Sequence, residues 1–175
     1  MIEKKQNQTF EEIVSEYLEG DNLKSILEFN EFLKENGLKT TKMSSKAWKV
    51  VYKGQKICTF KIWCKDVWFI SVALYKNFTD TETFEKHITV EQREFLINNF
   101  RTVLPCGSKT SGPCKGPGKI EFLGKNYDKY CGCYPFFQDV NNFKRDAESF
   151  ELTKQLTLVN KKILDDIAAA KKSAR

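Results

Sequence analysis

The spacing of apolar residues near the N-terminus predicts two consecutive helices. In TFEEIVSEYLEG the apolar residues fall on one helical face, Thr9 and Glu12 form a capping box, and Gly20 supplies a stop. Asp21 is expected to cap a second helix that ends at Gly37. The apolar stripe of this second helix is broad, which predicts that the helix is covered on two sides. Its members are Leu23, Ile26, Leu27, Phe29, Phe32 and Leu33.

From Ala47 the hydrophobic period changes, and three successive segments predict an antiparallel meander. The segments WKVVYK, ICTFKIWC and VWFISVALY are rich in β-branched and aromatic residues, and Gly54 with Gln55 can turn between the first two. The core face expected for the second strand comprises Cys58, Phe60, Ile62 and Cys64. Both cysteines are then expected to be small buried hydrophobes. Trp63 lies on the opposite face, which is either covered or part of a binding surface.

The C-terminal half of the chain adds a capped helix, a short hairpin and a long helix. Thr89 and Gln92 offer a second capping box before EQREFLINNFRTVL, and Pro105 ends that helix. The segments KIEFLG and KNYDKYC are predicted to pair as a hairpin around Gly124. A final helix begins near Asp146 and carries an amphipathic stripe. The stripe consists of Leu152, Leu156, Val159, Ile163, Ile167 and Ala170.

Together these elements predict a single α+β domain over residues 1–175. We expect an antiparallel sheet of three to five strands, packed by the N-terminal helices and by the long C-terminal helix. A Cys/Gly/Lys-rich loop segment at residues 106–133 is expected at the edge of this sheet. A chain of 175 residues is long enough for one sizeable core and short for two.

Charge and the length of the apolar segments narrow the class of protein. The 29 basic and 23 acidic residues give a net charge of +6, which favours an anionic ligand or a nucleic acid as partner. A dedicated nucleic-acid binder typically carries a stronger and more clustered positive charge than this. The longest apolar stretch, residues 67–75, is half as long as a membrane helix, and MIEKKQNQTF lacks the apolar run of a secretory signal. We therefore expect a cytoplasmic protein without a membrane partner.

Four of the six cysteines lie in the loop segment, and three interpretations of their chemistry are open. Zinc needs four converging donors, and a Cys-x-Cys pair can place two thiolates on one ion if Gly132 bends the chain. The spacing nevertheless lacks the paired Cys-x2-Cys knuckles of typical zinc sites. Neighbouring lysines can also favour the thiolate form needed for redox chemistry, and free loop thiols are the third interpretation. The four candidate metal ligands are Cys106, Cys114, Cys131 and Cys133.

The same segment offers two lysines as candidate ligand-binding residues. Residues 107–112 have the glycine spacing of a phosphate loop, but the Lys-Ser/Thr pair that such a loop requires is missing. What remains is an anion-binding nest of backbone amides assisted by Lys109 or Lys115, or an ordinary solvated loop.

Tryptophans and the single histidine complete the list of candidates. Trp63, with Trp48 and Trp68, can form a stacking platform for bases or the wall of an apolar pocket, or all three can pack in the core. His87 is the only histidine, which excludes metal sites that need two, and we expect it at the surface or at a helix entry. The chain shows no nucleophile elbow and no dinucleotide fingerprint, so no catalytic residue is predicted.

The Cys/Gly/Pro-rich start of the loop segment, the stretch KIEFLGKNY, the Cys-x-Cys pair and a final long helix follow one another in this chain. In these features the chain resembles small uncharacterised proteins of low-GC Gram-positive bacteria. Those proteins join an N-terminal helix and a Trp-bearing sheet to a cysteine-rich C-terminal part. The resemblance implies no activity, cofactor or catalytic residue.

Three classes of function follow from the sequence. We expect foremost a non-enzymatic domain that binds a ligand or a partner, with a cysteine cluster for which zinc is the candidate cofactor. The first alternative is a nucleic-acid-binding protein that uses the lysine-rich loop and the aromatic face of the sheet. The second is a thiol redox enzyme that uses Cys131 and Cys133. The first class is favoured because the residue constellations that the two alternatives require are incomplete.

Overall fold

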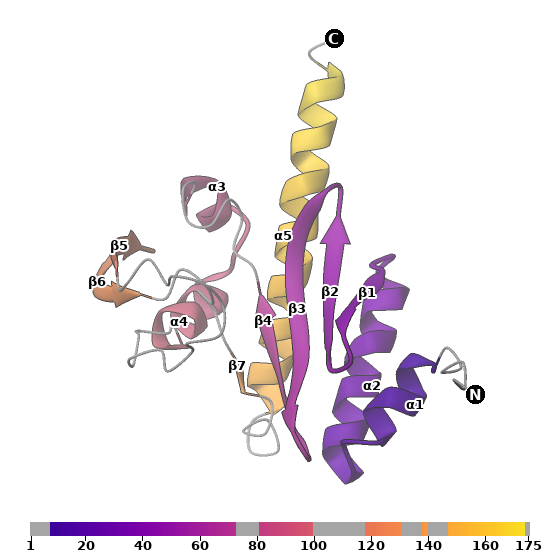
Figure 1. Cartoon of the computed structure of the whole chain (residues 1–175). Coiled ribbons are helices and arrows are strands. Elements are labelled where there is room, and N and C mark those ends of the chain that lie inside the picture. The colour runs from indigo at the N-terminus through magenta and orange to yellow at the C-terminus, as the bar shows by residue number, and fades with distance from the viewer. Residues whose placement is uncertain (1–7, 73–80, 100–117, 131–137, 140–146, 174–175) are drawn as a thin grey trace.

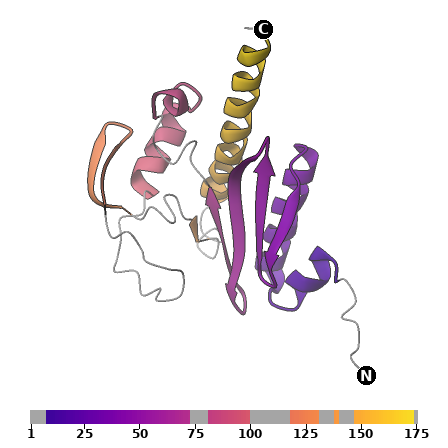
Figure 2. The same cartoon turned by 45° about the horizontal axis from the view of Figure 1, so that its top comes forward.

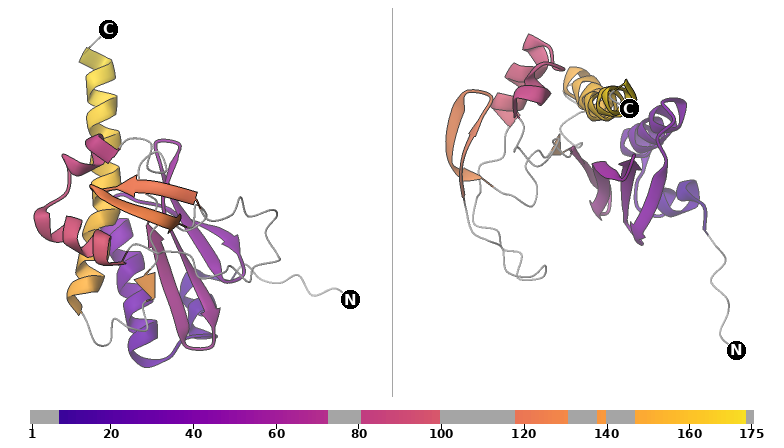
Figure 3. Two further views of the ribbon diagram at one scale, coloured as in Figure 1. Left: turned by 90° about the vertical axis from the view of Figure 1, so that its left-hand side faces the viewer. Right: turned by 90° about the horizontal axis from the view of Figure 1, so that it is seen from above.

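The chain folds into a sheet covered by helices on one face. The structure is a computed structural model that describes residues 8–72, 81–99, 118–130, 138–139 and 147–173. These residues form five helices, a five-stranded antiparallel sheet and a separate two-stranded hairpin, which is the predicted α+β class. Two of the helices, α2 (Gly20–Glu35) and α5 (Ala147–Ser173), lie on the same face of the larger sheet (Figures 1 and 3). We call this covered face the inner face.

Local capping explains where the first helix begins. In α1 (Phe10–Ser15), the Glu12 amide donates to the Thr9 hydroxyl at 3.2 Å and the Thr9 amide donates to the Glu12 carboxylate at 2.8 Å. The predicted capping box is thus confirmed. The predicted cap of the second helix is wrong, because Glu19 is the N-cap of α2 and forms no side-chain cap. Asp21 lies in the first turn instead, where its negative charge interacts favourably with the positive N-terminal end of the helix dipole.

The larger sheet contains the predicted three-stranded meander and two further strands. Its order is β1-β2-β3-β4-β7, and all neighbours are antiparallel. The added edge strand β1 was not predicted, because TTKMS offers a single apolar residue and polar sequences are common at sheet edges. The strands are β1 (Thr40–Ser44), β2 (Ala47–Tyr52), β3 (Gln55–Cys64), β4 (Val67–Val72) and β7 (Gln138–Asp139).

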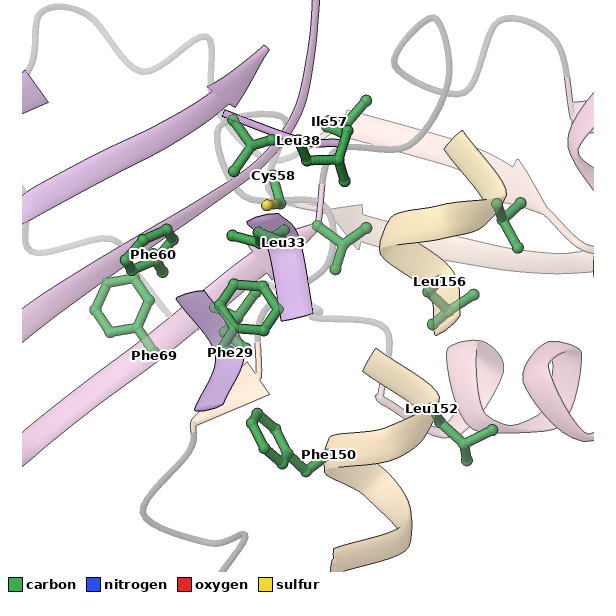
Figure 4. Close-up of a cluster of buried hydrophobic side chains, with 14 of the residues drawn as sticks. Phe29, Leu33, Leu38, Ile57, Cys58, Phe60, Phe69, Phe150, Leu152 and Leu156 are labelled. Atoms are coloured by element: carbon green, nitrogen blue, oxygen red, sulfur yellow. The ribbon is translucent and has the colours of Figure 1, made fainter. Parts of the chain in front are cut away.

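Aromatic rings fill the space between the inner face and the helices. The ring centroid of Phe29 on α2 lies 5.5 Å from that of Phe60 on β3 and 6.4 Å from that of Phe150 on α5 (Figure 4). From α1, the Phe10 ring packs 5.0 Å from the Trp48 ring. Burying each such ring contributes about 2 kcal/mol to folding. Phe29, which is fully buried, therefore joins α2, the sheet and α5 in one core.

The two strand cysteines differ in their environment. Cys58 is fully buried on the inner face, as predicted, and burial raises the pKa of its thiol. Cys64 is exposed, so the prediction that it is buried is wrong. The register of β3 with β4 shifts between Ile62 and Cys64, which leaves Trp63 as an extra residue in the ladder. This irregularity, next to the β3–β4 turn, breaks the alternation on which the prediction relied.

A second group of elements lies beside α5 (Figure 2). The short helix α3 (Thr81–Glu85) was not predicted, because its five residues carry one buried aromatic, Phe84. In α4 (Val90–Asn99) the predicted capping box is confirmed, since Thr89 and Gln92 bond each other's backbone amides at 3.0 and 3.1 Å. The predicted continuation of this helix over residues 100–104 lies outside the described residues.

The predicted hairpin is confirmed as a small sheet of its own. Its strands are β5 (Gly118–Phe122) and β6 (Lys125–Tyr130). The hairpin docks on α4, because the Tyr127 hydroxyl donates to the Ile97 carbonyl at 3.3 Å and Arg93 donates to the Leu123 carbonyl.

The C-terminal helix is the longest element. α5 spans 27 residues and extends past the end of the sheet (Figure 1). The predicted stripe is buried from Leu152 to Ile163, half-buried at Ile167 and exposed at Ala170, because the last turns have no sheet beneath them. Within the described residues, no helix combines the length and the apolar character needed to cross a membrane.

Candidate binding site on the outer face of the sheet

The predicted cysteine site cannot be placed in the structure. Its four cysteines, with Lys109 and Lys115, lie outside the described residues. In the described part of the chain, Cys58 and Cys64 are free thiols, and no three His, Cys, Asp or Glu side chains gather closely enough to hold a metal. The zinc site and the thiol redox centre therefore stay predictions.

His87 has a structural role between α3 and α5. It precedes α4, as expected for a helix-entry histidine. Its Nδ1 lies 2.7 Å from the Thr83 carbonyl oxygen, and its Nε2 lies 2.9 Å from the Asp166 carboxylate. The imidazole thus links the short helix to the long one.

The face of the sheet opposite α2 and α5, which we call the outer face, carries a row of polar side chains. Thr41, Lys49, Thr59 and Ser71 face one another in register across β1, β2, β3 and β4. Neighbouring strands are about 4.8 Å apart, so this row spans about 14 Å. Seen from above, no helix of the described residues crosses this face (Figure 3).

Exposure of the outer face decreases from β1 toward β4. In the polar row Thr41 is exposed, Lys49 and Thr59 are half-buried, and Ser71 is buried. A second row shows the same trend, since half-buried Lys61 pairs with buried Phe69. The half of the outer face over β1, β2 and β3 is therefore the part that a large ligand can reach.

Trp63 is the most exposed large aromatic residue in the described part of the chain. The residue is 65% exposed, whereas Trp48 and Trp68 are 3% and 0% exposed. Core packing is thus confirmed for Trp48 and Trp68. Trp63 is the one tryptophan for which the binding interpretation still applies. Its ring lies 6.3 Å from the Phe69 ring, and the Lys61 ammonium lies 4.9 Å from its centroid. Both contacts are with outer-face residues, so the indole belongs to this face.

Positive charge is concentrated in the strands that form this open half. Residues 39–65 contain eight lysines and no Asp or Glu. Residues 8–38, which include α1 and α2, contain two lysines and eight acidic residues, a net charge of −6. The fold places these two segments in adjacent layers, because α2 covers the inner face. The lysines of the basic segment are Lys39, Lys42, Lys46, Lys49, Lys53, Lys56, Lys61 and Lys65.

Several lysines of the basic segment are engaged with neighbours away from the outer face. Lys53 pairs with Asp165 of α5 at 2.6 Å, Lys65 pairs with Glu19 at 3.2 Å, and Lys46 lies over the Tyr17 ring at 3.9 Å. In contrast, Lys49 and Lys61 form no ion pair with any described residue. These two ammonium groups are among the positive charges that the outer face itself presents.

Lys49 and Lys61 are diagonal neighbours on adjacent strands. Lys49 pairs with Thr59, and Lys61 follows two residues later on the same face. The two residue positions are about 7 Å apart, so their ammonium groups share one part of the outer face and repel each other. A bound anion would relieve this repulsion. The pair is therefore suited to holding neighbouring negative charges of one ligand.

The local charge pattern of the sequence indicates this site, but the net charge of the whole chain does not show it. The overall value of +6 averages the basic segment with the acidic helices before it. A charge count in a sliding window would have separated the two. Trp63 was identified from its strand position, whereas Lys49 and Lys61 were not singled out.

Comparisons with known protein families, with curated proteins and with solved structures find no match for this chain. The resemblance to bacterial proteins is therefore still a prediction, and the function must be argued from the site itself.

Proposed function

We propose that the protein is a non-enzymatic, cytoplasmic binding domain whose outer face binds nucleic acid. The observation that carries this proposal is the basic segment of residues 39–65, which has no acidic residue and forms the open half of the outer face. Lysines that neutralise phosphates release condensed counterions, and this release drives most sequence-independent nucleic-acid binding. Lys49 and Lys61 supply two such contacts on one open surface.

The shape of the site favours a polymer over a small ligand. Small molecules are usually held in concave, largely apolar pockets. The open half of the outer face is instead a strand surface with a polar row that crosses its three strands. An extended polyanion can lie across several strands at once and meet lysines at more than one point.

The proposal is tested by removing both lysines from the outer face. Binding of a labelled oligonucleotide of about 20 nucleotides is measured by fluorescence anisotropy for wild type and for the K49Q/K61Q double variant. Loss of two phosphate contacts should weaken binding about 25-fold at about 0.1 M salt. It should also reduce the slope of log K against log salt by about 1.4.

The matched control removes the same charge from the helical layer. Lys24 on α2 and Lys162 on α5 are exposed, and neither forms an ion pair with a described residue. The K24Q/K162Q variant should bind within about twofold of wild type, because both charges are remote from the ligand. Equal losses in the two double variants, or no binding by wild type at low salt, would refute the proposed function.

A further inference from the structure

We infer that the outer face takes its nucleic acid as a single strand and stacks an unpaired base on Trp63. This inference rests on the proposed function and adds the class of nucleic acid and the residue that selects it. Paired bases show only their edges in the grooves of a duplex, whereas unpaired bases offer their π-faces to aromatic side chains. An exposed indole on an open sheet can therefore stack on the bases of a single strand but not on those inside a duplex.

The surroundings of Trp63 suit a stacking residue. It is 65% exposed, although tryptophan is highly buried on average. The register shift between Ile62 and Cys64 places Trp63 as the extra residue, and such bulges commonly re-aim side chains beside functional sites. Phe69, which is 8% exposed, supports the indole from the sheet at a centroid distance of 6.3 Å. The ring is thus contacted by Phe69 and by the Lys61 ammonium, and most of its remaining surface is exposed to solvent.

Two lysines of the outer face lie on the same strand as Trp63 or on the strand beside it. The Lys61 ammonium is 4.9 Å from the Trp63 centroid, and Lys49 is the diagonal neighbour of Lys61. A strand that stacks one base on the indole can therefore bring its adjacent phosphates to these two lysines. An acidic protein segment would satisfy the lysines but would have no base for the indole, so charge and ring together favour nucleic acid.

The test compares ligands and Trp63 variants. The ligands are a single-stranded oligothymidylate of about 20 nucleotides, a duplex of the same length and poly-L-glutamate. We expect the single strand to bind at least about tenfold more tightly than either competitor, and W63A to lose about tenfold on the single strand alone. W63F, which keeps an aromatic face, should retain most of the affinity. V90A is the control, because Val90 is 75% exposed on α4, away from the sheet.

Fluorescence supplies an independent readout of stacking. Trp63 is the only one of the three tryptophans that is exposed, so quenching of indole emission by the single strand should come from this residue. W63F should abolish the quenching while it still binds the oligonucleotide.

Each outcome has a defined meaning. If W63A binds the single strand like wild type while K49Q/K61Q weakens it, stacking is refuted and the proposed function stands. Equal affinity for duplex and single strand refutes the single-strand preference. Tighter binding of poly-L-glutamate than of either nucleic acid, or no binding of any ligand, overturns both proposals.

Discussion

Asp165 joins the tip of the β2–β3 hairpin to the long helix. The Lys53 ammonium lies 2.6 Å from its carboxylate, the Tyr52 hydroxyl donates to it at 2.7 Å, and Lys161 lies at 3.4 Å. The hydrogen bonds from Lys53 and Tyr52 lower the pKa of Asp165 to about 2. Lys53 has a φ of 45° and precedes Gly54 at 78°, as in the tight turns that suit hairpins. A local turn thus presents the lysine to a carboxylate far away in sequence.

We predict that D165N lowers the free energy of unfolding by about 1 kcal/mol at neutral pH, a modest value because the carboxylate is 38% exposed and screened by water. The folded pKa is depressed, so the stabilisation is present above the ordinary carboxyl pKa near 4 and is lost as the pH falls through about 2. Urea unfolding at several pH values checks this. E94Q, which alters an exposed carboxylate on α4, should show no such effect. A D165N deficit that is the same at neutral pH and near pH 2 would contradict the prediction.

At the scale of elements, the open half of the sheet carries a small cost in stability. Lys49 and Lys61 are like charges on adjacent strands, and no described acid compensates them. Residues placed for binding commonly reduce stability in this way.

We expect K49Q/K61Q to be slightly more stable than wild type, by a few tenths of a kcal/mol, at low ionic strength. The gain should vanish at about 0.5 M salt, because exposed charges are then screened within a few ångströms. Thermal unfolding at the two salt concentrations measures the difference. A double variant that is less stable than wild type at low salt would contradict the prediction, because the two lysines would then stabilise the sheet.

Elements with strong local signals were predictable from the sequence. Both capping boxes, the three-strand meander, the β5–β6 hairpin and α5 follow from residues close together in the chain. The edge strand β1 and the short helix α3 were missed, because a polar edge strand and a five-residue helix have little hydrophobic periodicity. Local hydrophobic periodicity thus predicts those helices and strands that bury a complete face of apolar residues.

The candidate site was predictable only in part. The position of Trp63 on the second face followed from strand alternation. The exposure of Cys64 did not, because a bulge depends on how two strands pair. The role of Lys49 and Lys61 needed the fold itself, since only the sheet register shows that they share a face. The cysteine interpretations cannot be compared with the structure, because those residues lie outside its described ranges.

At the scale of the whole molecule, the zinc interpretation of the loop cysteines predicts a bound metal. Purified, reduced protein should contain close to one equivalent of zinc, because four thiolates in the 106–133 segment can converge on one ion. C131S should release the zinc, as measured by elemental analysis. C64S is the control, because Cys64 is exposed on the sheet and takes no part in the predicted cluster. Metal-free wild-type protein would refute the zinc site and leave the outer-face proposals unaffected.

The separation of charge between layers has a consequence for how fast a ligand is captured. Within the described residues, the acidic segment 8–38 and the basic segment 39–65 lie in adjacent layers, and this uneven distribution of charge contributes an electric dipole across the sheet and α2. A nearby polyanion exerts a torque on such a dipole and turns the lysine side forward before the surfaces touch. A larger share of collisions then begins in a productive orientation. Added salt should therefore slow association more than it hastens dissociation.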